Sequence, residues 1–180
     1  MAFNLDPVIK KEASRWGLTL AAVNVLFYLV AYVAYRQMFV SFWGTMALFV
    51  VGIVLVIMGV NSVRKEYGGF IEFKEAFSTA FIVYLIASLI LTVVIILLFN
   101  VVDPAAAVEI QDLTIENTIA VAERFGVDEK QLDEMIEKIE STNQYGIANQ
   151  VRGFFTGLII TAILSAIIAA FMKKKRPFDA

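Results

Sequence analysis

The side chains that could do chemistry within the apolar parts of this chain are few, and none of them is charged at neutral pH. Of those expected at membrane depth, Asn24 is the one strongly polar residue, and the others are hydroxyls: Tyr28, Tyr84, Ser88, Thr92, Thr161 and Ser165. Amides and hydroxyls can bind a ligand or a neighbouring helix, whereas proton- and ion-coupled carriers place ionisable residues in their spans. We therefore expect no coupled carrier, and we expect Asn24 to be an interhelical hydrogen-bond anchor rather than a ligand site.

The sequence contains no Cys and no His, which excludes thiol nucleophiles, imidazole bases and the usual zinc ligands. It also has no nucleophile elbow, no phosphate-binding Gly loop and no calcium-loop spacing. We therefore expect no enzyme, no catalytic residue, no metal and no cofactor. A membrane enzyme would need carboxylates that converge near the interface, for which Glu72 and Glu75 are available.

Four charge-free stretches of 20 to 27 residues carry these side chains: Trp16–Tyr35, Gln37–Val63, Ala76–Val102 and Gly153–Met172. About 20 apolar residues suffice to cross a bilayer core about 30 Å thick, because a helix rises about 1.5 Å per residue. The first stretch is longer than the apolar region of a signal peptide, so we expect it to be retained. We predict an all-α polytopic membrane protein in which residues 1–180 form a single four-span membrane domain.

The distribution of positive charge predicts the orientation of the spans. Ten of the Lys and Arg residues would lie on the side of the two termini, and five would lie on the other side. Because positive residues near span ends favour the cytoplasm, both termini are predicted to be cytoplasmic. The block between spans three and four would then be extracytoplasmic.

The block Asp103–Gln150 is predicted to be an acidic, amphipathic helical hairpin. It holds eleven acidic and three basic residues. Asp103 followed by Pro104 is typical of a helix start, Gly126 predicts its end, and Asp128 starts the second helix. An apolar stripe at helical spacing on that helix is a candidate partner-docking surface: Leu132, Met135, Ile136 and Ile139. The acidic charge could attract cations or a basic partner, or it could simply be a solvated surface.

Two ladders of small residues predict where helices pack closely. The fourth stretch has one every four residues: Gly153, Gly157, Thr161, Ser165 and Ala169. The second stretch has one every seven: Thr45, Gly52 and Gly59. Lipid gives helices no hydrophobic drive to associate, so close backbone approach along small residues matters. We expect these ladders to pack the four spans against one another, although a homo-oligomer seam is also possible.

The link between spans two and three predicts a turn followed by an interfacial segment. Gly68 and Gly69 favour the turn. Phe70, Phe73 and Phe77 then recur at helical spacing among charged residues, which predicts an amphipathic elbow on the cytoplasmic side. The alternative is a short loop.

The segment Gly68–Phe77 (GGFIEFKEAF) resembles the entry to the third span in a bacterial membrane family catalogued as domain of unknown function 4199. The basic tail Lys173–Phe178 (KKKRPF), the length and the four spans are similar to that family as well. The resemblance implies a protein of the inner membrane of a Gram-negative cell. It implies no activity and no functional residues.

We therefore predict a non-enzymatic integral membrane protein, an accessory or scaffold subunit of an envelope complex. The alternative is a small oligomeric transporter, flippase or channel, with Asn24, Tyr28 and Ser88 along its path. The expected partners are membrane lipid and either another membrane or envelope protein or a second copy of the chain. No nucleic acid is expected.

Overall fold

The structure is a computed structural model that describes residues 6–175, and nearly all of these residues are helical. The elements are α1 (Pro7–Ala34), η1 (Arg36–Phe39), α2 (Phe42–Glu66), α3 (Phe73–Leu97), η2 (Leu98–Val102), α4 (Pro104–Phe125), α5 (Glu129–Glu140) and α6 (Ile147–Met172). Four helical segments are long and apolar enough to cross a membrane: α1, α2, α3 continued by η2, and α6. This confirms the predicted all-α, four-span fold. Part of the predicted basic tail, residues 176–178, lies outside the described residues.

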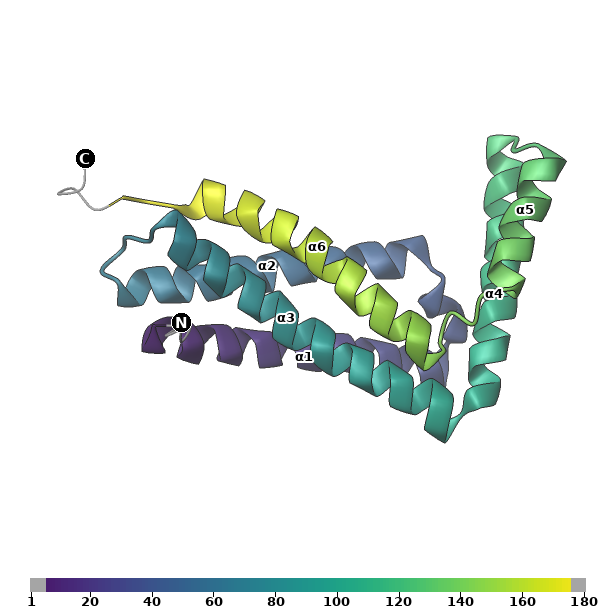
Figure 1. Ribbon diagram of the computed structural model, residues 1–180, viewed down its shortest axis with the longest axis horizontal. Coiled ribbons are helices and arrows are strands. Elements are labelled where there is room, and N and C mark those ends of the chain that lie inside the picture. The colour runs from purple at the N-terminus through teal and green to yellow at the C-terminus, as the bar shows by residue number, and fades with distance from the viewer. Residues whose placement is uncertain (1–5, 176–180) are drawn as a thin grey trace.

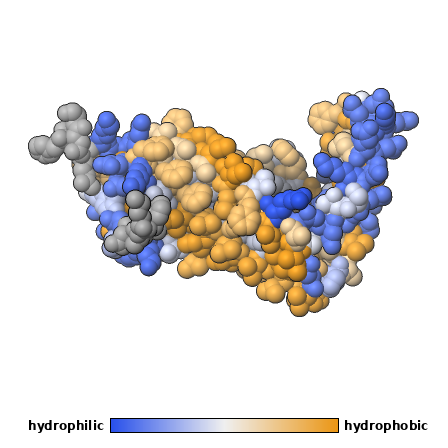
Figure 2. Space-filling model, viewed as in Figure 1, coloured by the Kyte–Doolittle hydropathy of each residue, from blue (hydrophilic) through white to orange (hydrophobic). Residues whose placement is uncertain are grey.

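The four spans lie side by side in an elongated bundle, and α4 and α5 form a hairpin that runs across one end of it (Figure 1). The first and last described residues lie at the opposite end. We call these the hairpin end and the terminal end. Figure 2 shows a hydrophobic middle between two hydrophilic ends, the distribution expected of a bundle that spans a bilayer.

The third span is the centre of the bundle, because α1, α2 and α6 all pack on α3. Both helices bury small residues, among them Ala13 and Gly17 on α1 and Ala80 and Ala87 on α3, and Gly17 faces Ile86 of α3 directly. Small side chains let two backbones approach closely, which is how helices associate without a hydrophobic drive. By contrast, α2 and α6 contact each other only slightly.

The first span starts earlier than its charge-free stretch does. Asp6 caps α1, since its Oδ1 accepts a hydrogen bond from the amide of Val8 at 2.8 Å, and Pro7 occupies the first helical position. Helix α1 therefore begins nine residues before Trp16. As a consequence, Glu12 lies inside the first span.

The link between α2 and α3 is a turn, as predicted, but the elbow after it is not a separate element. Gly68 and Gly69 have positive φ angles of 70° and 92°. A capping box between Glu72 and Glu75 then starts α3 at Phe73, so the chain passes directly from the turn into the span. Of the three phenylalanines in the predicted elbow, one therefore lies in the link and two lie in α3.

Of those phenylalanines, Phe70 precedes the helix, where Lys174 Nζ lies 5.5 Å from the centre of its ring. Phe73 and Phe77 lie in the first turns of α3, stacked in series with Phe81. Between Phe70 and Phe73, Ile71 pairs with Lys174 through two main-chain hydrogen bonds of 2.8 and 3.1 Å. This pairing ties the end of α6 to the link and closes the terminal end of the bundle.

The two hairpin helices start and stop at the expected cap residues, but α6 begins at Ile147, within the block 103–150 that was assigned to the hairpin. Asp103 caps α4, and Gly126, with φ 65°, ends it. The stripe on α5 is only partly free, however. Its residues Leu132, Ile136 and Ile139 are half-buried, and only Met135 is exposed, at 46%. Because α5 packs on α4, most of the candidate docking stripe serves the hairpin itself.

Candidate functional site

Five of the seven polar side chains expected at membrane depth line one open cavity between the spans, while Thr92 lines a second cavity and Ser165 is buried. The first cavity has a volume of about 280 Å³, and all four spans contribute to its wall. The polar members of the wall are Asn24, Tyr28, Thr45, Tyr84, Ser88 and Thr161. Gly52 of the α2 ladder lies there too. The second cavity, of about 200 Å³, shares Tyr28 and Leu91 with the first.

The cavity borders α2 and α6, the two spans that barely contact each other although both pack on α3. Within residues 6–175 the Asn24 side chain makes no hydrogen bond, so it lines the cavity instead of bridging two helices. The Tyr84 hydroxyl is also buried without a hydrogen-bond partner in this part of the chain. These groups can hydrogen-bond an uncharged polar ligand, but they supply no acid or base for chemistry at neutral pH.

The two small-residue ladders differ in how far they pack against other spans. On α2, a Cβ at Gly59 would lie 3.2 Å from Trp16 Cβ, and one at Gly52 would lie 3.9 Å from a methyl of Leu20, so both pack against α1. Thr45 is exposed, and its hydroxyl donates to the carbonyl of Ser41. The α2 ladder therefore packs the bundle, as predicted, except at its first position.

The ladder on α6 is packed only in its second half. Ser165 and Ala169 are fully buried. Thr161 is half-buried at the cavity. Nothing lies within 4 Å of a Cβ built at Gly153 or Gly157. Intramolecular packing therefore accounts for the half near the terminal end and leaves the half near the hairpin end open.

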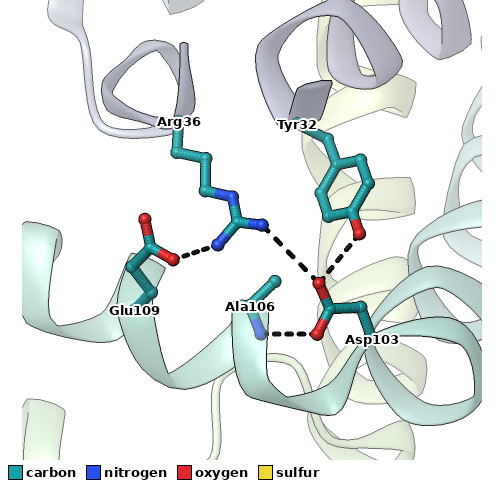
Figure 3. A network of polar contacts seen from close by, with 5 residues as sticks. All are labelled: Tyr32, Arg36, Asp103, Ala106 and Glu109. Carbon is teal, nitrogen blue, oxygen red and sulfur yellow. Dashed lines mark hydrogen bonds and ion pairs between the residues drawn. The ribbon is translucent and has the colours of Figure 1, made fainter. Parts of the chain in front are cut away.

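A network of charges joins the bundle to the hairpin (Figure 3). Arg36, at the start of η1, lies between Asp103 and Glu109 of the α4 segment. Its Nη2 is 3.6 Å from Asp103 Oδ2, and its Nη1 donates to Glu109. The hydroxyl of Tyr32 donates to Asp103 Oδ2 at 2.8 Å, and the amide of Ala106 donates to Oδ1 at 3.1 Å. Both carboxylate oxygens of Asp103 therefore accept a hydrogen bond.

These contacts lower the pKa of the Asp103 carboxyl below its usual 3.8. The largest cause is the hydrogen bond from Tyr32, and the amide of Ala106 and the charge of Arg36 add to it. The network was not predicted from sequence. Asp103 follows Tyr32 by 71 positions, so their contact has no local signal in the sequence. The one indication was Arg36, an isolated positive charge between two apolar stretches.

A buried carboxylate at the terminal end was also missed. Glu12 is 3% exposed, and its oxygens lie 3.4 Å from Arg15 Nη1 and 3.8 Å from Lys11 Nζ. Helical spacing could have revealed it, because Glu12 falls on the same face as Ile9 and Trp16. A span defined by the absence of charge could begin only at Trp16, so it left out Glu12.

The comparisons with known proteins give one match. A family model described as a protein of unknown function (DUF4199) matches residues 15–174, a range that extends into all four spans. This match confirms the resemblance carried by the segment Gly68–Phe77. No curated protein and no solved structure matches the chain.

Proposed function

The chain belongs to the DUF4199 family, whose description assigns no activity, and we propose that it is a non-enzymatic integral membrane protein, an accessory or scaffold subunit of an envelope complex. In this proposal it lies in the bacterial inner membrane with both termini in the cytoplasm and residues 103–150 in the periplasm. Its partners are lipid and either another membrane or envelope protein or a second copy.

The observation that carries the proposal is the open half of the α6 ladder. Gly153 and Gly157 present a helix surface without side chains, and nothing in the described part of the chain fills it. Large apolar side chains flank it, since Phe155 and Ile160 are exposed. In lipid, such a surface lets another helix approach closely. A span from a partner would complete the packing that Ser165 and Ala169 make within the chain.

The test compares the assembly state of the full chain with that of two α6 variants. Gly157→Ile places a large side chain on the open surface, where a Cβ has nothing within 4 Å, and Ala170→Ile makes a similar change at an exposed position near the other end of α6. The wild type and Ala170→Ile should be recovered from mild detergent in one larger complex of defined mass, and Gly157→Ile should be recovered alone. A monomer without a co-purifying protein in all three cases overturns the proposal.

The proposed orientation has its own test, because the chain has no native Cys. Single cysteines at Glu66 and Ser141, both exposed at opposite ends of the molecule, should react with a membrane-impermeant thiol reagent from opposite sides. In intact cells stripped of their outer membrane, only the variant at Ser141 should be labelled. Labelling of Glu66→Cys under those conditions reverses the orientation.

The cavity favours the second candidate function, a small oligomeric transporter, flippase or channel. It brings together Asn24, Tyr28 and Ser88, the residues expected along such a path. Purified protein in sealed vesicles should then move an uncharged polar solute or a labelled lipid. Asn24→Leu should abolish that movement, while Thr156→Val, at an exposed position of α6 that lines neither cavity, keeps it. Vesicles as tight as protein-free ones remove this candidate.

A further inference from the structure

A second concave surface lies outside the bundle, in the corner between the hairpin and the start of α2. Its volume is about 770 Å³. One wall is formed by η1 and the first turn of α2, and the other by α4 between Leu113 and Phe125. In Figure 2 the projecting part of the hairpin is separated from the bundle by a hollow on this side. We call this surface the corner groove.

The corner groove lies at the depth of lipid headgroups. The spans end at this end of the molecule, and α4 runs across them, so in a bilayer α4 lies along the membrane surface (Figure 1). Aromatic side chains line the groove and are largely uncovered, with Trp43 79%, Phe125 82% and Phe42 65% exposed. Tryptophan and other aromatics are enriched at the membrane interface, where apolar chains meet polar headgroups.

Two opposite charges stand on the α4 wall of the groove. Arg124 and Glu116 both line it, and neither has an ion-pair partner within residues 6–175. They are eight positions apart, or about 12 Å along the helix axis at 1.5 Å per residue. Helical side chains lean toward the helix N-terminus, so the long Arg124 side chain extends toward Glu116.

The wall that carries these charges is held in place. Asn117, which also lines the groove, donates from Nδ2 to the carbonyl of Val40 at 3.3 Å. The Arg36 network fixes the start of α4, and Gly126 ends the helix just past the groove. The groove is therefore a formed surface that a ligand can enter without refolding the hairpin.

We propose that the corner groove binds the headgroup of a phospholipid that carries both a phosphate and a primary ammonium, the phosphatidylethanolamine class. The Arg124 guanidinium contacts the phosphate, because its planar donors match phosphate oxygens. The Glu116 carboxylate accepts hydrogen bonds from the ammonium. The aromatic wall contacts the glycerol region and the first part of the acyl chains.

The charge of the hairpin argues for a zwitterionic lipid over an anionic one. Residues 103–150 carry eleven acidic and three basic groups, so the block as a whole repels an anionic headgroup, and of the three basic residues Arg124 lines the groove. A choline headgroup has no N–H to donate to Glu116. This inference needs no protein partner, so it stands apart from the scaffold role and from the transporter alternative.

Trp43 is a built-in reporter, since it lines the groove and the only other tryptophan is Trp16. The Trp16→Phe protein is reconstituted in vesicles of unlabelled phosphatidylcholine. Phosphatidylethanolamine, phosphatidylcholine or phosphatidylglycerol, each brominated near the glycerol end of one acyl chain, is then added in increasing fractions. Quenching of Trp43 should show about a three- to tenfold preference for phosphatidylethanolamine, the range expected from one or two charge-assisted contacts at an exposed site.

Three variants in the Trp16→Phe background separate the two contacts. Arg124→Gln should weaken the quenching by all three lipids, because each carries the phosphate that Arg124 contacts, and Glu116→Gln should make phosphatidylethanolamine and phosphatidylcholine equal. Lys130→Gln, a change of the same kind on α5 outside the groove, should retain the preference. Equal quenching by all three lipids in the Trp16→Phe protein means annular contact only and overturns the proposal, as does a preference for phosphatidylethanolamine over phosphatidylcholine that survives Glu116→Gln.

Because Trp16 is packed and hydrogen-bonded, a second measurement avoids replacing it. Native mass spectrometry of otherwise wild-type chains, released from detergent with equal amounts of the three lipids, should show phosphatidylethanolamine adducts. Those adducts should be depleted in Arg124→Gln and unchanged in Lys130→Gln. Identical adduct patterns in both variants overturn the proposal independently of the fluorescence result.

Discussion

Gly17 of α1 lies directly against Ile86 of α3, so that a Cβ at position 17 would stand 2.9 Å from the Cβ of Ile86. Real Cβ atoms essentially never come that close, and the Cβ of a helical isoleucine moves only with its backbone. The contact therefore sets the separation of α1 and α3, the two spans with the most extensive interface. The packing of the side chains between α1 and α3 depends on this separation.

We expect Gly17→Ala to destabilise the bundle by about 1–3 kcal/mol, the usual cost of inserting one methylene into a packed interior. The matched control is Gly157→Ala, where a Cβ meets nothing within 4 Å. This control should be neutral or up to about 1 kcal/mol stabilising, because Ala is the better helix former. Unfolding of both variants in mixed micelles, followed by helical circular dichroism, measures the difference. Equal stabilities would show that the close approach is relaxed in solution.

The Arg36 network should hold the hairpin at its angle to the bundle. Two spin labels, at exposed Leu18 on α1 and exposed Glu134 on α5, report that angle as a distance. Arg36→Gln should broaden the distance distribution, because it removes the contacts to both Asp103 and Glu109. Arg124→Gln, which changes the same residue type outside the network, should leave it narrow. A narrow distribution in Arg36→Gln would assign the angle to main-chain geometry alone.

The same labels should respond to pH in a defined direction. The pKa of Asp103 is lower in the docked hairpin than its usual 3.8, because Tyr32, the Ala106 amide and Arg36 favour the charged form. Docking is therefore fully supported above the usual pKa and is lost as the pH falls through the lowered one. We expect no change between pH 7 and about 5, and broadening only below about pH 4. The distance distribution of Asp103→Asn should be broad at every pH. Broadening at pH 6 in the protein with Asp103 intact would contradict the assignment to this carboxyl.

The four spans and the ends of the two hairpin helices could be predicted from sequence because they depend on local signals. Length and hydropathy define a span, and Asp103, Pro104 and Gly126 are cap residues whose preferences act within one turn. By contrast, the sequence did not show that the third span begins inside the predicted elbow. The spacing of Phe70 and Phe73 is helical, but the Glu72–Glu75 capping box starts the helix between them, and a local cap outweighs a short periodicity.

The candidate sites depend on contacts between distant parts of the chain, and here the sequence is less informative. It identifies Asn24 and Thr161 as polar but does not indicate that both line one cavity. It likewise predicts a single ladder on α6, whereas only tertiary packing separates the buried Ser165 from the open Gly157. Which faces of a helix are occupied is decided by its neighbours, and four similar apolar helices carry little information about their order.

Glu12 and Arg15 provide a test of how a buried charge is tolerated at the terminal end. The Glu12 side chain is 4% exposed while its partner Arg15 is 61% exposed, so the arginine can keep its water while it neutralises the carboxylate. Arg15→Gln removes the nearer cation and leaves only Lys11, at 3.8 Å. Breaking a fully buried pair costs about 3–5 kcal/mol, and because Arg15 is largely solvated we expect about 1–2 kcal/mol here.

The opposite change should behave differently. Glu12→Leu replaces the buried carboxylate by an apolar side chain of similar size, and such replacements are often neutral or stabilising. Its unfolding free energy should therefore equal or exceed that of the wild type. Arg15→Gln added to Glu12→Leu should cost no more than the contact of the Arg15 guanidinium with the Trp16 ring, whose centre lies 5.2 Å away. The double-mutant cycle, measured by denaturant unfolding in mixed micelles, isolates the pair. If Glu12→Leu unfolds more easily than Arg15→Gln, the carboxylate itself makes a structural contact that the ion pair does not explain.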